Sequence, residues 1–389
     1  MHKLFLPLIA ITLLTFTPSC KKDKGPTEAQ KKAVISNYSA IVYANYSDAL
    51  TRAQELKTKV DAFVANPSQA GLDEARDAWK AARLPYGQTE VYRFSAGPID
   101  DDNGPEGLLN SWPLDEKFID YVQGQPNVGL INDVTNVPVL SKSVIEAMNE
   151  QAGETNISCG YHAVEFMLWG QDFSASGPGN RPYTDFIVGG TAANQARRAQ
   201  YLQICTDLII DHLQYLVDAW APNGSNYRHD FENGNTDQAL TKILQGMGSL
   251  AKGELAGERL EVAYDTQLQE DEHSCFSDNT TNDVRMNMLG IKNVFMGTYT
   301  RIDGSTITGT GIYELIKAKD EDLGEELEED DIDGCMDACN DILAPFDQQI
   351  LASNPTGRQT VKTAIDRLKV LGDKLSLAAQ KLGLTIVVQ

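Results

Sequence analysis

Apolar residues recur at helical spacing along most of this chain. Between residues 28 and 65 they return every three or four positions, and Asn66-Pro67-Ser68 then breaks the pattern. This spacing predicts one long amphipathic helix over 28–65. A second helix begins near Leu72, and we expect Pro85 to kink or end it because proline lacks the N–H that continues a helix.

The remaining chain alternates between helical stretches and Gly/Pro-rich loops. Residues 95–113 and 177–190 are rich in Gly, Pro, Asp and Asn, which predicts loops. Alternation typical of strands is confined to 305–310 and the last few residues. The pattern therefore indicates an all-α fold. Its further helices are expected at 138–148, around 161–169, and at 191–221, 236–266, 283–296, 311–319, 331–351 and 357–382.

One polar stretch divides the helical pattern into two parts. Residues 222–235 are rich in Gly and Asn and lack helical periodicity, which predicts a domain boundary. The length of 389 residues leaves each part large enough to bury its own core. We therefore expect two helical bundles, an N-terminal domain at 28–230 and a C-terminal domain at 231–389.

The first residues have the features of a secretion signal. A positively charged start is followed by an apolar run at 4–16 that is too short to span a bilayer. The ending Thr17-Pro18-Ser19-Cys20 resembles a bacterial lipobox. On that resemblance, 1–19 is a signal peptide, Cys20 is lipidated, and 20–27 is a tether. The alternative is an ordinary cleaved signal peptide with an incidental cysteine.

The chain is strongly acidic, and this narrows its partners. It has 33 Lys and Arg against 55 Asp and Glu, a formal net charge of −22. Such a charge repels nucleic-acid phosphates and anionic lipid surfaces and concentrates cations. We therefore expect no nucleic-acid partner, and contact with a membrane only through the lipid anchor.

One polar pair stands inside an otherwise apolar helical segment, Tyr161–Trp169. His162 and Glu165 are three positions apart, so they lie on one face of the helix. An imidazole and a carboxylate in this arrangement suit a metal site or an acid/base pair. The alternative is a hydrogen-bonded structural pair in the core.

A second polar cluster follows at residues 269–279. Its oxygen-rich surroundings and single imidazole suit iron, zinc or manganese better than a soft metal. Alternatively, Asp278 or Asn279 caps the next helix while the acids face water. The candidate ligands of this cluster are Glu270, Asp271, His273 and Asp278.

These segments together resemble the imelysin family, whose hallmark is Gly-x-His-x-x-Glu. Gly160, His162 and Glu165 match the hallmark, and Trp169-Gly170-Gln171-Asp172 extends the match. Three further segments match in the same order: the region 79–100, the turn Asn110-Ser111-Trp112-Pro113, and the block 258–279.

The resemblance implies a fold, a location and a site. The fold would be two related helical bundles with the motif near their interface. The protein would be located in the bacterial cell envelope, facing the periplasm or the cell surface, and it would be linked to iron uptake. His162 and Glu165 would form the core of a metal site, with Glu90 and Asp100 as further ligands. His273 and its acidic neighbours would be the counterpart in the second half.

Three functions remain open at this point. The first is binding of a metal ion or an iron-bearing ligand, with iron as the first candidate metal and zinc as the second. Envelope transport proteins would be its partners. The second is a zinc-type metallopeptidase, the label attached to the family, with Glu165 as the catalytic candidate. Such an enzyme needs three protein ligands and a separate base, whereas the common His-Glu-x-x-His pattern is absent here. The third is a non-catalytic scaffold or binding component.

Overall fold

The structure is a computed structural model that describes residues 25–388. The signal segment 1–19 and Cys20 lie outside the described residues. The regular secondary structure of the described part is almost entirely helical, as the periodicity predicted. No helix in residues 25–388 is both long enough and apolar enough to cross a membrane.

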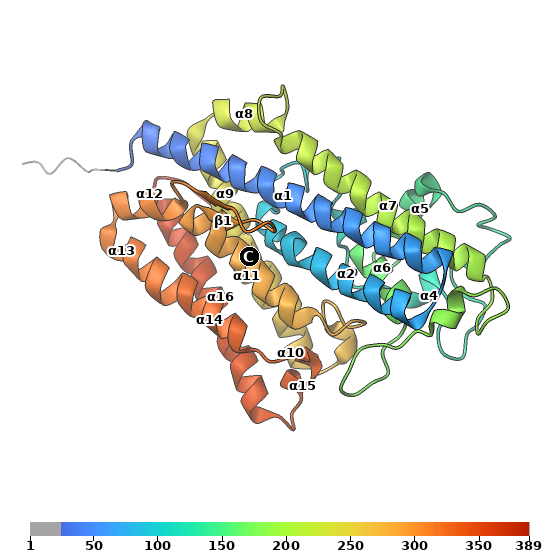
Figure 1. Cartoon of the computed structure of the whole chain (residues 1–389). Helices are drawn as coiled ribbons and strands as arrows, with labels where there is room; N and C mark the ends of the chain where they lie inside the picture. Colours follow the sequence, from blue (N-terminus) through green and yellow to red (C-terminus); the bar gives the residue numbers. More distant parts are fainter. Residues whose placement is uncertain (1–24, 389) are drawn as a thin grey trace, which may run out of the picture.

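The N-terminal part is organised around the long helix α1, which spans Glu28–Ala65 as predicted. Thr27 begins it with a capping box, because its hydroxyl accepts from the Gln30 N–H while the Gln30 side chain accepts from the Thr27 N–H. Helices on either side of α1 pack against it (Figure 1). The longer helices of this part are α2 (Gln69–Thr89), α6 (Tyr161–Trp169) and α7 (Gln195–Trp220).

Helix α2 corrects one expectation. It continues through Pro85 to Thr89, and the Pro85 carbonyl accepts a hydrogen bond from the Asn45 side chain at 2.8 Å. The packing of α2 between α1 and α11 (Thr280–Met296) supports the helix across the missing N–H.

Short elements fill the long connections of the N-terminal part. The predicted loop at 95–113 contains one of them, and the others lie on either side of α6. They are η1 (Glu90–Tyr92), α3 (Glu106–Leu109), α4 (Glu116–Ile119), α5 (Lys142–Met148) and η2 (Tyr183–Phe186).

The C-terminal part begins inside the expected linker, where 227–233 forms a short helix. Asn235 caps the next helix, with its side chain accepting from the Gln238 N–H. The helical run to Thr266 is one continuous rod, whose middle section η3 is a π-helix. Its elements are α8 (Tyr227–Asn233), α9 (Thr236–Ser249), η3 (Leu250–Glu261) and α10 (Val262–Thr266).

The rest of the C-terminal part packs around α16 (Pro355–Lys381). The predicted helix at 331–351 is broken at 342–345, because the residue before Pro345 is disfavoured in the α conformation. The strand-like alternation predicted at 305–310 is confirmed by a short strand there, which pairs antiparallel with a strand at 298–300. The elements are η4 (Gln269–Asp271), β1 (Thr298–Thr300), β2 (Thr306–Thr308), α12 (Ile312–Lys319), α13 (Glu321–Glu326), η5 (Leu327–Ile332), α14 (Asp333–Asp341) and α15 (Phe346–Ile350).

The two parts meet where α11 packs along α2. At Gly290 a β-carbon would lie 2.4 Å from the Gln88 carbonyl oxygen, so only glycine allows this approach. One cluster of buried hydrophobic residues runs through both parts. The contact between α2 and α11 also places the segment 269–279, which leads into α11, against α6. The boundary at 230/231 remains a prediction.

Candidate functional site

Helix α6 is held at a fixed place in the core. All nine of its residues are buried. Gly160 begins it with φ +95°, and a β-carbon there would meet the Leu109 carbonyl oxygen at 2.7 Å. The indole N–H of Trp79 donates to the Tyr161 carbonyl at 2.9 Å. The polar residues of α6 are therefore positioned by the surrounding structure and not by solvent.

His162 and Glu165 form the predicted pair. The Nδ1 atom of His162 lies 2.9 Å from Oε2 of Glu165, and both side chains are fully buried. The other carboxylate oxygen of Glu165 accepts from the backbone N–H of Ser277 at 3.0 Å and from its hydroxyl at 2.6 Å. Both carboxylate oxygens thus have partners, and the carboxylate fixes the orientation of the His162 ring.

His273 forms a second pair of the same kind. Its Nδ1 atom lies 3.2 Å from Oδ2 of Asp283, and the same oxygen accepts from the Ser274 hydroxyl at 2.5 Å. Oδ1 of Asp283 accepts from Nε of Arg83 at 3.1 Å. The sequence pattern singled out His273 but not Asp283, which lies on the first turn of α11.

The two imidazoles stand next to each other. The ring centroids of His162 and His273 are 4.6 Å apart at 81°, and Trp112 lies 5.0 Å from His162. In each ring Nδ1 faces a carboxylate, so Nε2 is the nitrogen left for another partner. Nε2 of His162 is buried and has no hydrogen-bond partner among residues 25–388. A buried polar atom without a partner is costly, so it marks a place where a ligand would be favoured.

Burial keeps both imidazoles neutral. It lowers the pKa of His162 well below its usual value, and it lowers the pKa of His273 to about 4. Burial also raises the pKa of Glu165 to about 8, against the opposing effect of its Ser277 hydrogen bonds. Neutral imidazole is the form that binds a metal ion or accepts a proton, so the site suits either role.

A buried charge network extends from this site toward Glu90. Arg83 donates from Nη1 to the Asn110 side chain at 2.5 Å, and Asn110 lies 3.5 Å from Oε1 of Glu90. Oε2 of Glu90 accepts from Arg259 at 2.6 Å and from Arg93 at 2.7 Å. Burial alone would raise the pKa of Glu90, but the two arginines lower it to about 2. Glu90 is therefore an ionised partner of arginines, joined to His273 only through this network.

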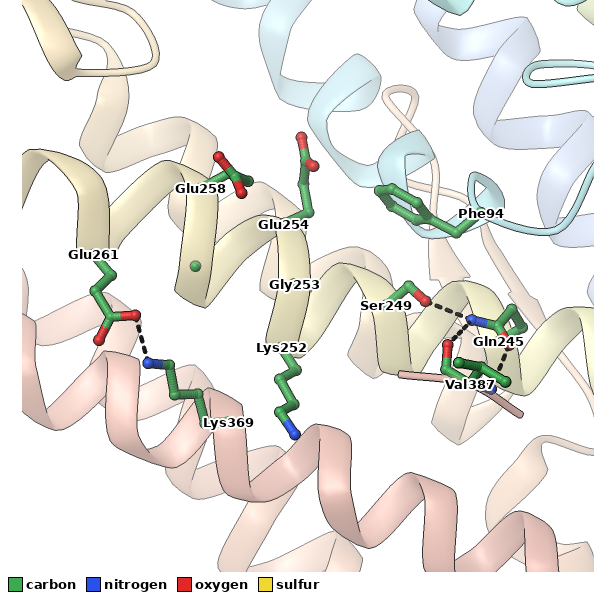
Figure 2. Close-up of a pocket in the computed structure, with 11 residues that line it drawn as sticks. Phe94, Gln245, Ser249, Lys252, Gly253, Glu254, Glu258, Glu261, Lys369 and Val387 are labelled. Carbon is green, nitrogen blue, oxygen red and sulfur yellow. Dashed lines mark hydrogen bonds and ion pairs between the residues drawn. The ribbon is translucent and has the colours of Figure 1, made fainter. Parts of the chain in front are cut away.

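A cavity of about 370 Å³ opens beside His273. Four carboxylates and two arginines line it, so the acids outnumber the bases and the cavity favours cations. A second and larger hollow of about 860 Å³ adjoins it on η3, and Glu254 and Glu258 line both. Figure 2 shows these two side chains on the side of Phe94, away from the Glu261–Lys369 pair. The smaller cavity is lined by Arg93, Glu106, Asn110, Ser111, Trp112, Pro113, Glu254, Glu258, Arg259, Val262, Asp271 and His273.

Element η3 shapes this wall because it is a π-helix, a wide form that is rare and frequently occurs at functional sites. It places Glu254 and Glu258 at the rim and turns Arg259 inward to Glu90.

The other predicted site residues lie at different places. Asp100 closes a turn of its own loop, where it accepts from the backbone N–H groups of Ser95 at 3.2 Å and Gly97 at 2.9 Å. Asp271 reaches the cavity wall, and the exposed Glu270 lies on η4. Asp278 is half-buried in a left-handed conformation with φ +56°. Of the second cluster, the structure thus brings His273 to the His162 pair.

The two histidines are oriented to bind a metal ion, but the protein does not supply a complete set of ligands. Two neutral imidazoles, each oriented by a carboxylate at Nδ1, are the arrangement in which histidine holds a metal through Nε2. Among residues 25–388, however, no three His, Cys, Asp or Glu side chains converge as a ready-made ligand set. A metal held by His162 and His273 would complete its coordination with water or with a ligand in the cavity.

Sequence reasoning missed the residues of the buried hydrogen-bond and charge network that holds the carboxylate partner of His273. Arg83, Asn110 and Arg259 lay inside the matched motif segments but carried no signal of their own. A buried arginine needs a buried partner, so an arginine within an apolar helix face could have indicated the network.

Comparisons with known proteins agree with this fold. The profile of the imelysin family matches residues 42–375. Iron-regulated protein A of Synechococcus elongatus is 25% identical over 362 residues, which cover 89% of this chain and 86% of that protein. A crystal structure of an iron-regulated protein A precursor from Parabacteroides distasonis has TM-score 0.71 and 22% identity, covering 92% of this chain and 96% of that one. An imelysin-like protein from Psychrobacter arcticum has TM-score 0.61 and 13% identity, covering 93% and 98%.

Proposed function

The chain belongs to the imelysin family, and on this premise we propose that it binds a metal ion at His162 and His273 and takes part in iron uptake. Iron is the first candidate and zinc the second. The relative in Synechococcus elongatus is named for iron regulation, and that name supports iron here only as part of the proposal.

One observation carries the proposal. His162 and His273 stand side by side with their Nδ1 atoms on carboxylates, and the Nε2 atom of His162 is buried without a partner. Placing a cation there would supply the missing partner and match the four carboxylates of the adjoining cavity. In this arrangement Glu165 and Asp283 orient the two imidazoles.

We further propose that the protein works at the cell envelope. Cys20 would carry a lipid that holds the mature chain at the membrane, with 20–27 as the tether. The acidic surface would leave the lipid as the main membrane contact. Envelope transport proteins would be the partners that deliver or receive the metal or an iron-bearing ligand.

The alternatives have less support. A zinc peptidase requires a free general base, whereas Glu165 is already engaged by His162 and Ser277. A scaffold whose polar cluster only joins the two parts would explain the Arg83–Asp283 pair, but not a buried nitrogen without a partner.

The test is metal binding by the chain from Lys21 onward, purified without a histidine tag and equilibrated with iron, zinc or manganese. We expect metal that is lost in His162→Asn and His273→Gln, since both changes remove a ring nitrogen while keeping a polar side chain. His229→Ala is the matched control, because that histidine is exposed and paired only with its neighbour Asp230. Unchanged stoichiometry in His162→Asn, with intact circular dichroism, would refute the site.

A role in uptake needs a separate measurement. Cells that lack the protein should accumulate less iron under limitation, and His162→Asn should fail to restore uptake although it reaches the envelope. Full restoration by this variant would separate the uptake role from the metal site.

A further inference from the structure

We propose a second cation site, formed by Glu272 with Asp172, Asp278 and Asp347, that takes a divalent cation preferring oxygen ligands, such as Ca²⁺. This site is independent of the proposed function of His162. It rests on a buried acid that lacks partners and on the way three chain segments bring acids to it.

Glu272 is the unusual residue. Its side chain is 0% exposed, and neither carboxylate oxygen has a hydrogen-bond partner among the described residues. The Thr280 hydroxyl is near but makes no hydrogen bond of ordinary geometry with it. An isolated carboxylate in such a place is strongly disfavoured. A bound cation removes this penalty because it neutralises the charge and coordinates the oxygens.

Glu272 is not part of the hydrogen-bond network of the histidines. The next residue, His273, pairs with Asp283, whereas neither carboxylate oxygen of Glu272 has a hydrogen-bond partner among residues 25–388. The two sites are therefore neighbours along the chain but use different side chains.

Three further acids lie near Glu272: Asp172 and Asp347 on other segments, and Asp278 on its own segment 269–279. The charges of all three act on Glu272. Asp172 and Asp347 are themselves buried. The positive charge of the Lys80 side chain partly offsets the negative charge of Asp278. Four carboxylates with so little compensation are a composition that a divalent cation stabilises.

Hydrogen bonds between the segments support this placement independently of charge. The Gln269 side chain donates to Oδ2 of Asp172, which joins η4 to the loop after α6. The Gln348 side chain donates both to Asp347 and to the Ala175 carbonyl, which joins α15 to the same loop. The loop, η4 and α15 thus surround one place.

Calcium suits this arrangement better than a transition metal. It accepts six to eight oxygen ligands in flexible geometry, including carboxylates and water. The acids do not yet converge on one point, so binding requires their side chains to turn inward, with water completing the shell. The bound cation would favour that movement because it offsets the mutual repulsion of the acids.

The test is thermal unfolding of the chain from Lys21 onward with and without millimolar Ca²⁺ or Mg²⁺. We expect Ca²⁺ to raise the melting temperature by about 2–4 °C, as mass action predicts for a ligand about 100-fold above its dissociation constant. Glu272→Gln should abolish the rise and melt no lower than wild type without calcium. Asp278→Asn should weaken it, and asparagine tolerates the left-handed backbone of Asp278.

Two controls make the result specific. Glu329→Gln removes an exposed acid from the acidic stretch after Asp320 and should leave the calcium effect unchanged. His162→Asn should also leave it unchanged, which separates this site from the proposed metal site. The proposal is overturned by no calcium effect in wild type, by an effect that survives Glu272→Gln, or by an effect that disappears in His162→Asn.

Discussion

His162 and His273 come from distant parts of the chain, yet their rings lie 4.6 Å apart and each faces a carboxylate through Nδ1. Burial keeps both rings neutral, and His273 lines a cavity in which four carboxylates outnumber two arginines. This pairing is the structural basis of the predictions that follow.

Glu165→Gln should lower metal affinity by about 10- to 100-fold, the usual cost of losing a carboxylate partner of a ligand histidine. The glutamine amide would donate to Nδ1 of His162 and so place the ring proton on Nε2, which then cannot bind a metal. Titration with zinc and iron measures the effect. Ser277→Ala is the control, since it removes one hydrogen bond to Glu165 and should cost less. Equal affinities of Glu165→Gln and wild type would contradict the orienting role.

Arg83→Met should destabilise the fold by roughly 3–5 kcal/mol, because it leaves the buried carboxylate of Asp283 without its cation. Chemical denaturation measures the change. Adding Asp283→Asn to Arg83→Met should recover part of the loss, since the unpaired charge is then removed. Arg52→Met, in an exposed pair with Glu55, should change stability by less than about 1 kcal/mol. A similar loss of unfolding free energy in Arg83→Met and Arg52→Met would show that the buried pair stabilises the fold no more than the exposed pair does.

Glu90 should contribute to loss of stability in acid. Its pKa of about 2 in the folded protein lies below the ordinary value of 4.5. Its contribution, on the order of 3 kcal/mol, is therefore present above pH 4.5 and is lost as the pH falls toward 2. Unfolding free energies measured between pH 7 and pH 2.5 should fall less steeply below pH 4.5 in Glu90→Gln. Glu55→Gln should reproduce the wild-type curve, and a Glu90→Gln curve parallel to it would refute the assignment.

Gly160→Ala should destabilise the protein by more than backbone strain alone. The strain of φ +95° costs about 1–3 kcal/mol, and the new β-carbon would also meet the Leu109 carbonyl oxygen at 2.7 Å. Gly189→Ala provides the comparison, because Gly189 has φ +80° but open space around it. The difference between the two unfolding free energies isolates the steric term, and no difference would argue against tight packing of α6 on α3.

Local signals in the sequence were sufficient for several elements. The helix over 28–65 was predicted with its observed ends, because its periodicity, its Thr27 cap and its Asn66-Pro67 stop all act within a few residues. The same holds for the His162–Glu165 pair, since a spacing of three on a helix places both side chains on one face. Of the two outcomes expected at Pro85, a kink or an end, the end was wrong because packing against α1 and α11 outweighs a local helix breaker.

Partners across the chain were decided only by tertiary structure. Periodicity places Glu90 and Arg259 on their helices, but it does not reveal that they meet, and so Glu90 was predicted to be a metal ligand when it pairs with arginines. Likewise, the segment 269–279 contains four candidate ligands, and only the packing of α11 on α2 brings one of them, His273, next to His162. Short-range geometry is encoded in neighbouring residues, whereas burial and pairing depend on which distant surfaces the fold brings into contact.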